Sequence, residues 1–350
     1  MHLIESKTYV SSLKSICCED FAGKTVIITG ATGMIGSCLV DALAIWNRTH
    51  AEPCNIVAVS RRREGAIHRF AYCWDAPWFS YIQQDVCAPV ENWPEKVDYV
   101  IHAASNADPV SFAKSPVDTL MANVLGTDLL LKAGLQRGMK RFLYISSGEM
   151  YGQPDVQQSD FAETYCGPVD HSAPRACYPA GKRAAEVLCQ AYISQYGVDA
   201  VIVRPCHTFG PTMTATDSRA VSEFLRNAAA GKNIGMKSAG LVERSHCYVV
   251  DAVKAILCVL LKGECGGAYN IADPACQMTI RDFAMLAAKA GNSQVVFENP
   301  NDLEISGYSK VSRSVLSSAK LQELGWCGQK TADDAVAQTV LILREIREEK

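Results

Sequence analysis

Short apolar runs alternate with longer amphipathic stretches over roughly the first two thirds of this 350-residue chain. A short continuous apolar run suits a buried strand, whereas apolar positions that repeat every three or four residues suit a helix. The pattern predicts buried strands at residues 24–29, 55–60, 81–84, 98–103, 141–146 and 200–204. It predicts helices at residues 34–45, 117–138 and 179–197. Such alternation is typical of a parallel sheet covered by helices on both faces.

The pattern changes after Arg204. Glycine and proline become frequent in residues 205–247, which contain one predicted helix near 218–230. Further helices are predicted near residues 279–290, 314–324 and 332–348, whereas residues 248–261 and 268–271 resemble one more helix and strand of the first unit. Residues 1–22 are a leader of mixed polarity, which we expect to form a short helix packed on the body.

These elements predict an α/β fold with two lobes. The first is a Rossmann-like doubly wound parallel sheet that binds a dinucleotide, formed by residues 1–204 with 245–272 returning to it. The second is a smaller, mostly α-helical C-terminal substrate lobe, formed by residues 205–244 and 273–350. A chain of this length can bury a core in each lobe.

The amino-acid composition limits the kinds of partner and location that we expect. With 34 basic and 37 acidic residues the net charge is −3, which does not favour nucleic acid or a membrane surface as a partner. The fifteen cysteines are an odd number without a Cys-x-x-Cys motif, and we expect free thiols in the cytoplasm rather than disulfides or a metal site. The longest apolar stretch, residues 249–261, is interrupted by Asp251 and Lys254, so no membrane span is expected.

A glycine-rich turn joins the first predicted strand to the first predicted helix. Gly30 permits the sharp bend, Gly33 lets the backbone approach a pyrophosphate, and Gly36 lets helix and strand pack closely. The helix N-terminus faces the phosphate charge. The predicted dinucleotide-binding residues of this turn are Gly30, Thr32, Gly33, Met34, Ile35 and Gly36.

The residues after the second and third strands bear on the kind of dinucleotide. A carboxylate at the end of the second strand would hold the ribose 2′-hydroxyl of NAD. Here Ser60-Arg61-Arg62-Arg63 stands in its place, and these basic residues either bind the 2′-phosphate of NADP or form a solvated loop. After the third strand, Asp85 with Val86 is a candidate acceptor for an adenine amino group or an ordinary turn residue.

Tyr178 and Lys182 lie four residues apart at the start of a predicted helix. At this spacing two side chains share one helical face. Tyrosine ionises near pH 10, and a neighbouring ammonium would stabilise the phenolate and lower its pKa toward the working pH. Tyr178 would then take the proton from a sugar hydroxyl while hydride passes to nicotinamide. Lys182 would also hold the nicotinamide ribose.

A polar segment with Ser147 and Glu149 follows the strand predicted at residues 141–146. Ligands of open α/β sheets bind at the carboxyl ends of the strands. Ser147 is therefore expected to hydrogen-bond the reacting oxygen. Glu149 is expected to act as a base or to shape the site beside a substrate carboxylate.

The order of these motifs resembles that of the extended short-chain dehydrogenase/reductases that act on nucleotide sugars, over nearly the whole chain. Further matching segments are His102-Ala103-Ala104-Ser105, Asn123-Val124-Leu125-Gly126-Thr127, Ser146-Ser147-Gly148-Glu149-Met150-Tyr151-Gly152, Arg204-Pro205-x-x-Thr208-Phe209-Gly210-Pro211 and Ala319-Lys320-Leu321-Gln322-Glu323-Leu324-Gly325-Trp326. The resemblance implies NAD as the cofactor, with Ala103, Ala104, Ser105 and Asn123 beside it. It also implies a nucleotide-diphosphate-sugar substrate, which Ser105 would contact, and a homodimer built through the helices at 117–138 and 179–197.

Three segments resemble the UDP-glucuronate decarboxylases within that family: Arg175-Ala176-Cys177-Tyr178-x-x-Gly181-Lys182-Arg183-x-Ala185-Glu186, Asp217-Ser218-Arg219 and Arg244-Ser245-x-x-Tyr248-Val249-x-Asp251. By this resemblance Arg175 would meet a sugar carboxylate or phosphate, Arg219 would help hold the diphosphate, and Arg244 would lie near the reacting carbon or the diphosphate. A surface ion pair is the alternative for each arginine.

Two positions depart from the family pattern. Gly148 stands where dehydratases carry an aspartic acid that protonates the leaving hydroxyl, and where decarboxylases often carry serine. His207, a substrate-side position, stands where asparagine is usual. These departures weaken the dehydratase hypothesis most, and they predict an uncommon substrate site.

The implied chemistry begins with oxidation of a sugar C4 hydroxyl by bound NAD(P)⁺. Loss of CO₂ from C5, return of hydride to the other face, or loss of the C6 hydroxyl would then give a decarboxylase, a 4-epimerase or a 4,6-dehydratase. We favour decarboxylation, because Glu149, Arg175 and Arg244 occur together in that subgroup, and place epimerisation second. A dinucleotide-bound regulatory protein without turnover is the alternative outside enzymes.

Overall fold

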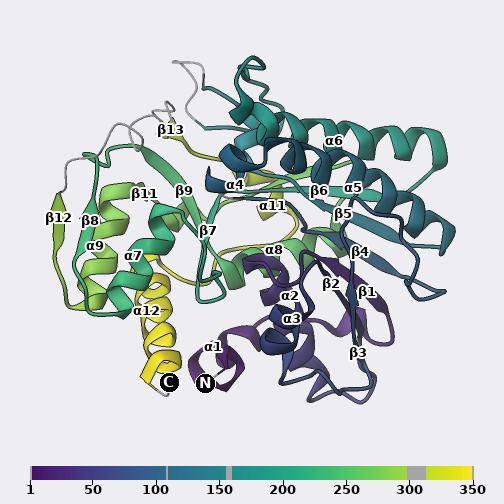
Figure 1. The fold of residues 1–350 in the computed structure, drawn as a ribbon, viewed down its shortest axis with the longest axis horizontal. Coiled ribbons are helices and arrows are strands. Elements are labelled where there is room, and N and C mark those ends of the chain that lie inside the picture. The colour runs from purple at the N-terminus through teal and green to yellow at the C-terminus, as the bar shows by residue number, and fades with distance from the viewer. Residues whose placement is uncertain (1, 108, 155–159, 298–312, 349–350) are drawn as a thin grey trace.

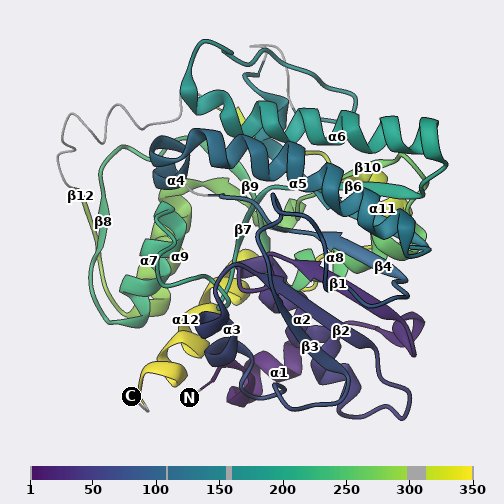
Figure 2. The same cartoon turned by 45° about the vertical axis from the view of Figure 1, so that its right-hand side comes forward.

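The computed structural model describes residues 2–107, 109–154, 160–297 and 313–348. Its centre is a seven-stranded parallel sheet in the order β10-β6-β5-β4-β1-β2-β3 (Figure 1; β10 is labelled in Figure 2). The strands are β1 (Thr25–Thr29), β2 (Asn55–Ser60), β3 (Phe79–Gln83), β4 (Tyr99–His102), β5 (Arg141–Ile145), β6 (Ala200–Pro205) and β10 (Ala268–Ile271). The strand order reverses beside β1, which opens a ligand-binding position where the loops after β1 and β4 diverge. The predicted doubly wound sheet is confirmed.

Helices cover both faces of this sheet. The buried side chains of α2 (Met34–Asn47), α3 (Arg63–Phe70) and α8 (Val249–Lys262) belong to one core. Those of α5 (Pro116–Gln136) and α6 (Cys177–Tyr196), which lie side by side in Figure 1, belong to the core of the opposite face. The strands read as continuous apolar runs because both faces are covered.

The second lobe packs α7 (Ala220–Ala229), α9 (Ile280–Gly291) and α12 (Ala332–Glu348) against one another (Figure 2). It also contains two small sheets. β8 (Ile234–Met236) pairs with β12 (Val295–Phe297). β9 (Glu243–Tyr248) pairs with β7 (His207–Phe209), β11 (Gln277–Thr279) and β13 (Arg313–Ser314), and so crosses the lobe boundary expected at residues 244 and 245.

The N-terminal leader packs on the first lobe and is held there by hydrogen bonds. Its helix α1 (Lys7–Leu13) lies between η1 (Leu3–Glu5) and η2 (Glu19–Phe21). The Tyr9 hydroxyl donates a 2.8 Å hydrogen bond to the buried carboxylate of Asp41 on α2. Tyr72 and Arg69 donate to the same carboxylate, at 2.6 Å and 2.9 Å. A single buried acid therefore joins three segments of the first lobe.

The remaining elements are short: α4 (Pro109–Lys114), η3 (Gly148–Tyr151), η4 (Pro174–Ala176), η5 (Pro274–Cys276) and α11 (Ala319–Glu323). The sequence pattern missed α3 and α4, and α11 is shorter than the helix predicted near residues 314–324. Both missed helices are short, at eight and six residues, so neither shows more than about two turns of a helical repeat. None of the helices in the described part of the chain is long and apolar enough to cross a membrane.

Candidate functional site

The glycine turn after β1 is packed too tightly for side chains. Gly30 has a φ of 64°, and a Cβ there would lie 2.7 Å from the carbonyl oxygen of Ala103. A Cβ on Gly36 would overlap the carbonyl of Gly30. Gly33 is the N-cap of α2, and no side chain caps that helix. The exposed backbone and open helix N-terminus fit the pyrophosphate of a dinucleotide.

The segment after β4 lies against this turn and is held by hydrogen bonds. The Ala104 N–H donates to the Thr29 hydroxyl at 3.3 Å. On α5, the Asn123 amide nitrogen donates to the Ser105 hydroxyl at 3.1 Å, and its oxygen accepts from the Tyr144 hydroxyl at 2.9 Å. Asn123 therefore links the expected cofactor segment at residues 103–105 to strand β5.

The residues at the end of β2 lie at the same edge of the sheet. Ser60 is buried, with its hydroxyl 3.2 Å from that of Tyr81. Arg61 is exposed and reaches the Asn106 side-chain oxygen at 3.5 Å. The basic run therefore keeps its charge in solvent, near the expected position of the ribose.

Asp85 and Val86 follow β3 at this edge. The Asp85 carboxylate is exposed and accepts a 2.9 Å hydrogen bond from the N–H of Cys87, so it stabilises the local turn. Val86 is buried, and a Cβ placed on Gly126 of α5 would lie 3.0 Å from its methyl group. Val86 thus helps to join the turn to α5.

Tyr178 and Lys182 are both buried where the start of α6 meets the end of β5. The Lys182 ammonium nitrogen donates a 2.7 Å hydrogen bond to the Ile145 carbonyl. It lies 4.9 Å from the centroid of the Tyr144 ring and 5.5 Å from that of the Tyr178 ring. The pair therefore lies at the carboxyl edge of the sheet, like the glycine turn.

The prediction that Lys182 lowers the pKa of Tyr178 is wrong for this arrangement. Burial and the charge of Glu149 raise the pKa of Tyr178 to about 12, and hydrogen bonding with Ser147 offsets only part of this rise. Burial likewise lowers the pKa of Lys182 to about 7. The reason is that both groups are removed from water, which disfavours the charged form of each.

Ser147 caps the short helix η3, whose first residues Gly148 and Glu149 lie next to Tyr178. The Ser147 hydroxyl accepts a 3.1 Å hydrogen bond from the Glu149 N–H. The Glu149 carboxylate pairs with the Arg175 guanidinium at 2.6 Å, and the two side chains are 39% and 51% exposed, so Arg175 forms the surface ion pair named as its alternative. A Cβ on Gly148 would lie 2.9 Å from a methyl group of Leu316, which occupies the space of the missing side chain.

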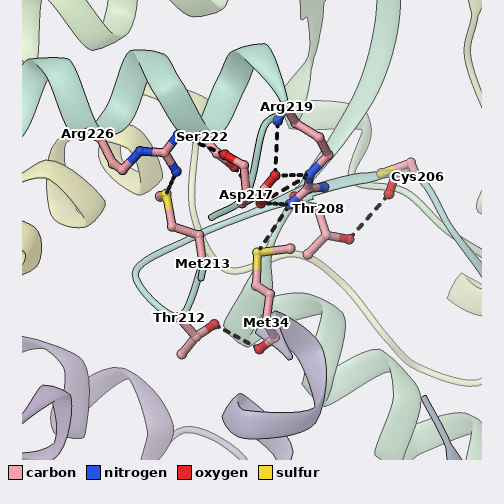
Figure 3. A network of polar contacts seen from close by, with 9 residues as sticks. All are labelled: Met34, Cys206, Thr208, Thr212, Met213, Asp217, Arg219, Ser222 and Arg226. Carbon is pink, nitrogen blue, oxygen red and sulfur yellow. Dashed lines mark hydrogen bonds and ion pairs between the residues drawn. The ribbon is translucent and has the colours of Figure 1, made fainter. Parts of the chain in front are cut away.

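Arg219 connects the second lobe to the glycine turn (Figure 3). Its guanidinium donates to the Asp217 carboxylate, at 2.6 Å for the shortest bond, and to the Thr208 carbonyl at 3.1 Å. The same group reaches the sulfur of Met34 at 3.6 Å. Arg219 therefore lies beside the N-terminus of α2, where a diphosphate would be expected.

Arg244 and His207 form a second polar pair in the second lobe. Arg244 donates a 3.1 Å hydrogen bond to Nε2 of His207. Burial and the charge of Arg244 hold the pKa of His207 well below its usual range, so the imidazole is neutral and can accept. The Nε atom of Arg244 is buried and has no hydrogen-bond partner among the described residues. An orphaned buried donor of this kind suits an anionic ligand.

Sequence reasoning missed two side chains of the site. Phe112 on α4 stacks on Tyr178, with ring centroids 4.5 Å apart and an angle of 26° between the planes. Leu316 fills the space beside Gly148. Neither position carries a motif, and each meets its partner only through the folded chain, so no local signal could have revealed them.

The described residues contain no group of three or more His, Cys, Asp or Glu side chains that could hold a metal ion. All fifteen cysteines are free thiols. At one edge of the parallel sheet lie the open N-terminus of α2, the buried Tyr178 phenol and Lys182 amine, and the half-buried Ser147 hydroxyl.

Fold and site together define an enzyme of the Rossmann type that uses a dinucleotide. The chain belongs to the NAD dependent epimerase/dehydratase family, which it matches over residues 26–272. This membership confirms the family resemblance and the expectation of NAD as the cofactor.

Known proteins with similar sequences are named as decarboxylases. UDP-glucuronic acid decarboxylase 6 of Arabidopsis thaliana is 34% identical over 249 residues, which cover 71% of this chain and 69% of that protein. UDP-glucuronic acid decarboxylase 1 of Xenopus tropicalis is 33% identical over 263 residues, which cover 75% of this chain but only 59% of that protein.

Among solved structures, UDP-glucuronic acid 4-epimerase of Bacillus cereus, in complex with UDP-glucuronic acid and NAD, superposes with a TM-score of 0.75. The match covers 92% of this chain and 99% of that chain at 19% identity. At this identity the likeness shows the shared fold.

Proposed function

We propose that this protein modifies a nucleotide-diphosphate sugar by oxidising its C4 hydroxyl with bound NAD⁺, and that UDP-glucuronate-type decarboxylation through a 4-keto sugar follows. The decarboxylase relatives support the substrate class. The observation that carries the reaction is the buried pair Tyr178 and Lys182 with the half-buried Ser147, at the same edge of the sheet as the glycine turn.

The roles follow from position. In its phenolate form Tyr178 takes the proton of the C4 hydroxyl and becomes the phenol, and the Ser147 hydroxyl holds the same substrate oxygen. Lys182, fixed by the Ile145 carbonyl, holds the nicotinamide ribose. When bound, NAD⁺ accepts the hydride. The expected cofactor residues at 30–36, 60–61, 85–86, 103–105 and 123 follow strands β1 to β4 or face them from α5.

The arginines suit the charged parts of the substrate. Arg219 lies beside the N-terminus of α2 and would bind the diphosphate. Arg244 has a free buried donor for an anionic oxygen, and His207 orients its guanidinium. Arg175 would leave Glu149 to meet the sugar carboxylate, because both acids compete for one guanidinium.

We favour decarboxylation over dehydration because the loop after β5 lacks an acidic side chain at Gly148. Loss of CO₂ from C5 places electrons on the adjacent 4-keto group and needs no acid for a leaving hydroxyl. Dehydration needs such an acid, and at Gly148 the space for one is filled by Leu316. A 4-epimerase is the second candidate, since it needs only the first step and hydride return to the other face.

The partners and location are part of this proposal. Helices α5 and α6 expose apolar side chains, among them Val117 and Val187, and these support a homodimer built through the two helices. The free thiols support the reducing cytoplasm. The chain's two lobes would act as the dinucleotide-binding and sugar-binding parts.

The function is tested by incubating the protein with UDP-glucuronate and NAD⁺ and separating the products. We expect CO₂ and a pentose nucleotide. Tyr178→Phe should lower turnover at least about 100-fold without changing NAD⁺ affinity, whereas Tyr196→Phe, an exposed tyrosine of the same helix, should change neither. A C4 epimer without CO₂ would support the epimerase instead. Turnover unchanged in Tyr178→Phe would remove Tyr178 as the base, whereas a wild type that binds NAD⁺ but shows no turnover would leave the regulatory alternative.

The basic residues after β2 are tested separately. Arg61 is exposed near the expected ribose, and its charge would attract a 2′-phosphate. If NADP binds there, Arg61→Ala should weaken NADP roughly tenfold and leave NAD unchanged. Equal affinities of the wild type and the variant for NADP would show that this loop is merely solvated. Calorimetry with each dinucleotide measures both constants.

A further inference from the structure

Phe112 links the two groups that would face opposite parts of the sugar. Its ring stacks on the ring of Tyr178, with centroids 4.5 Å apart. The guanidinium carbon of Arg175 lies 4.5 Å from the centroid of the same Phe112 ring. Arg175 in turn pairs with Glu149 at 2.6 Å. One aromatic side chain is therefore in contact with the proposed base and with the proposed carboxylate-binding arginine.

The short helix that carries Phe112 has no other buried anchor. Within α4, Phe112 is the one buried side chain and is 2% exposed. Val110 on the same helix is 45% exposed. A helix of six residues has little stability of its own, so tertiary contacts must hold it in place. The contacts of Phe112 with Tyr178 and Arg175 thus place α4 over the site.

We propose that Phe112 is a positioning residue, which fixes the ring of Tyr178 and the guanidinium of Arg175 relative to each other and keeps water from the phenol. The inference rests on the proposed function, since it assigns the phenol as the base. Stacked rings prefer this offset, near-parallel geometry, and a guanidinium over an aromatic face gains a cation–π attraction. The position carries no motif, so its assignment comes from the contact alone.

The electrostatic setting of Tyr178 predicts how loss of Phe112 would act. The groups that face the phenol are Ser147 and Glu149 from η3, Arg175 from η4, and Arg219 before α7, with Lys182 on α6 beside the ring. Burial is the largest cause of the raised pKa of Tyr178. Removing the Phe112 ring would admit water, stabilise the phenolate and lower that pKa.

The test compares Phe112→Ala and Phe112→Leu with Val110→Ala, a matched control on the exposed side of α4. For Phe112→Ala we expect kcat to fall roughly 10- to 100-fold, because the base and the arginine are no longer fixed. The acid limb of the kcat/KM pH profile should move down by about one pH unit. Phe112→Leu keeps an apolar side chain over the phenol. The acid limb of its kcat/KM pH profile should therefore stay in place, while kcat falls severalfold. Val110→Ala should match the wild type.

Three results would overturn the inference: a Phe112→Ala profile that coincides with that of the wild type, full activity of Phe112→Leu, or an equal loss in Val110→Ala. If the alanine variant does not fold, as judged by its melting curve and NAD⁺ binding, the leucine variant decides. Failure of the proposed function shows differently, as absence of turnover in the wild type. The ultraviolet difference spectrum of Tyr178 ionisation, taken against Tyr178→Phe, then still reports whether Phe112→Ala lowers the pKa of the phenol.

Discussion

The Thr212 hydroxyl donates a 2.9 Å hydrogen bond to the main-chain carbonyl of Met34. Met34 is the first residue of α2, in the glycine turn, and Thr212 comes from the segment after β7 in the second lobe. Arg219 reaches the Met34 sulfur from the same lobe (Figure 3). The two lobes thus meet at one residue of the dinucleotide turn, between the proposed sites for cofactor and diphosphate.

This contact predicts that NAD⁺ and the nucleotide part of the substrate strengthen each other's binding. Thr212→Val removes the hydrogen bond at nearly constant volume. We expect UDP to tighten NAD⁺ binding about fivefold or more in the wild type and little in the variant. Calorimetric titration of NAD⁺ with and without UDP measures the coupling. Thr49→Val is the matched control, because Thr49 makes the same kind of bond, to the Trp46 carbonyl, near the other end of α2. Equal coupling in wild type and Thr212→Val would contradict the prediction.

The close packing of the glycine turn gives a second prediction. A Cβ on Gly36 would overlap the Gly30 carbonyl, so Gly36→Ala must displace the turn. We expect NAD⁺ affinity to fall at least roughly tenfold, because backbone and phosphate no longer meet. Gly65 is also helical, but a Cβ there meets nothing within 4 Å. Gly65→Ala should therefore leave NAD⁺ affinity unchanged and stabilise the fold by up to about 1 kcal/mol. Similar affinities in the two variants would refute this reading.

The sequence predicted the parts of the molecule whose signal is local. The strands of the parallel sheet are continuous apolar runs, and the glycine turn, Tyr178 and Lys182 follow from spacing. What depends on burial was not predictable. The spacing of Tyr178 and Lys182 suggested a lowered phenol pKa, whereas their removal from water raises it. Contacts between distant segments, such as Phe112 with Tyr178 and Gly148 with Leu316, also have no signature along the chain.

Lys182 predicts an unusual dependence of stability on pH. Burial lowers its pKa from 10.5 to about 7. Because the folded pKa lies below the unfolded pKa, the free energy of unfolding rises as the pH increases from the folded to the unfolded value. At any pH below the folded pKa, the buried ammonium destabilises the fold by its full amount. Lys182→Met removes that cost. Without cofactor, the variant should be more stable than the wild type at pH 6 by on the order of 1–2 kcal/mol, with the difference fading near pH 10.

Urea denaturation at both pH values measures this effect. The expected gain is smaller than the full pKa shift suggests, because methionine leaves the Ile145 carbonyl without its donor. Lys14→Met, at an exposed lysine, is the control and should follow the wild type at each pH. A Lys182→Met variant less stable than the wild type at both pH values would show that the ammonium is held favourably.

Buried and exposed ion pairs in this chain should differ sharply in their effect on stability. Arg204 donates to both carboxylate oxygens of Glu186 on α6, at 3.0 Å and 2.7 Å, and both residues are 7% exposed. Glu186→Ala leaves the arginine charged and unpaired in the interior, and should lower the free energy of unfolding by about 3–5 kcal/mol. Lys132→Ala breaks the exposed pair with Asp128 on α5, which should matter by less than about 0.5 kcal/mol. Urea denaturation of both variants measures the difference. Equal small effects would mean that water enters to solvate Arg204 once Glu186 is gone.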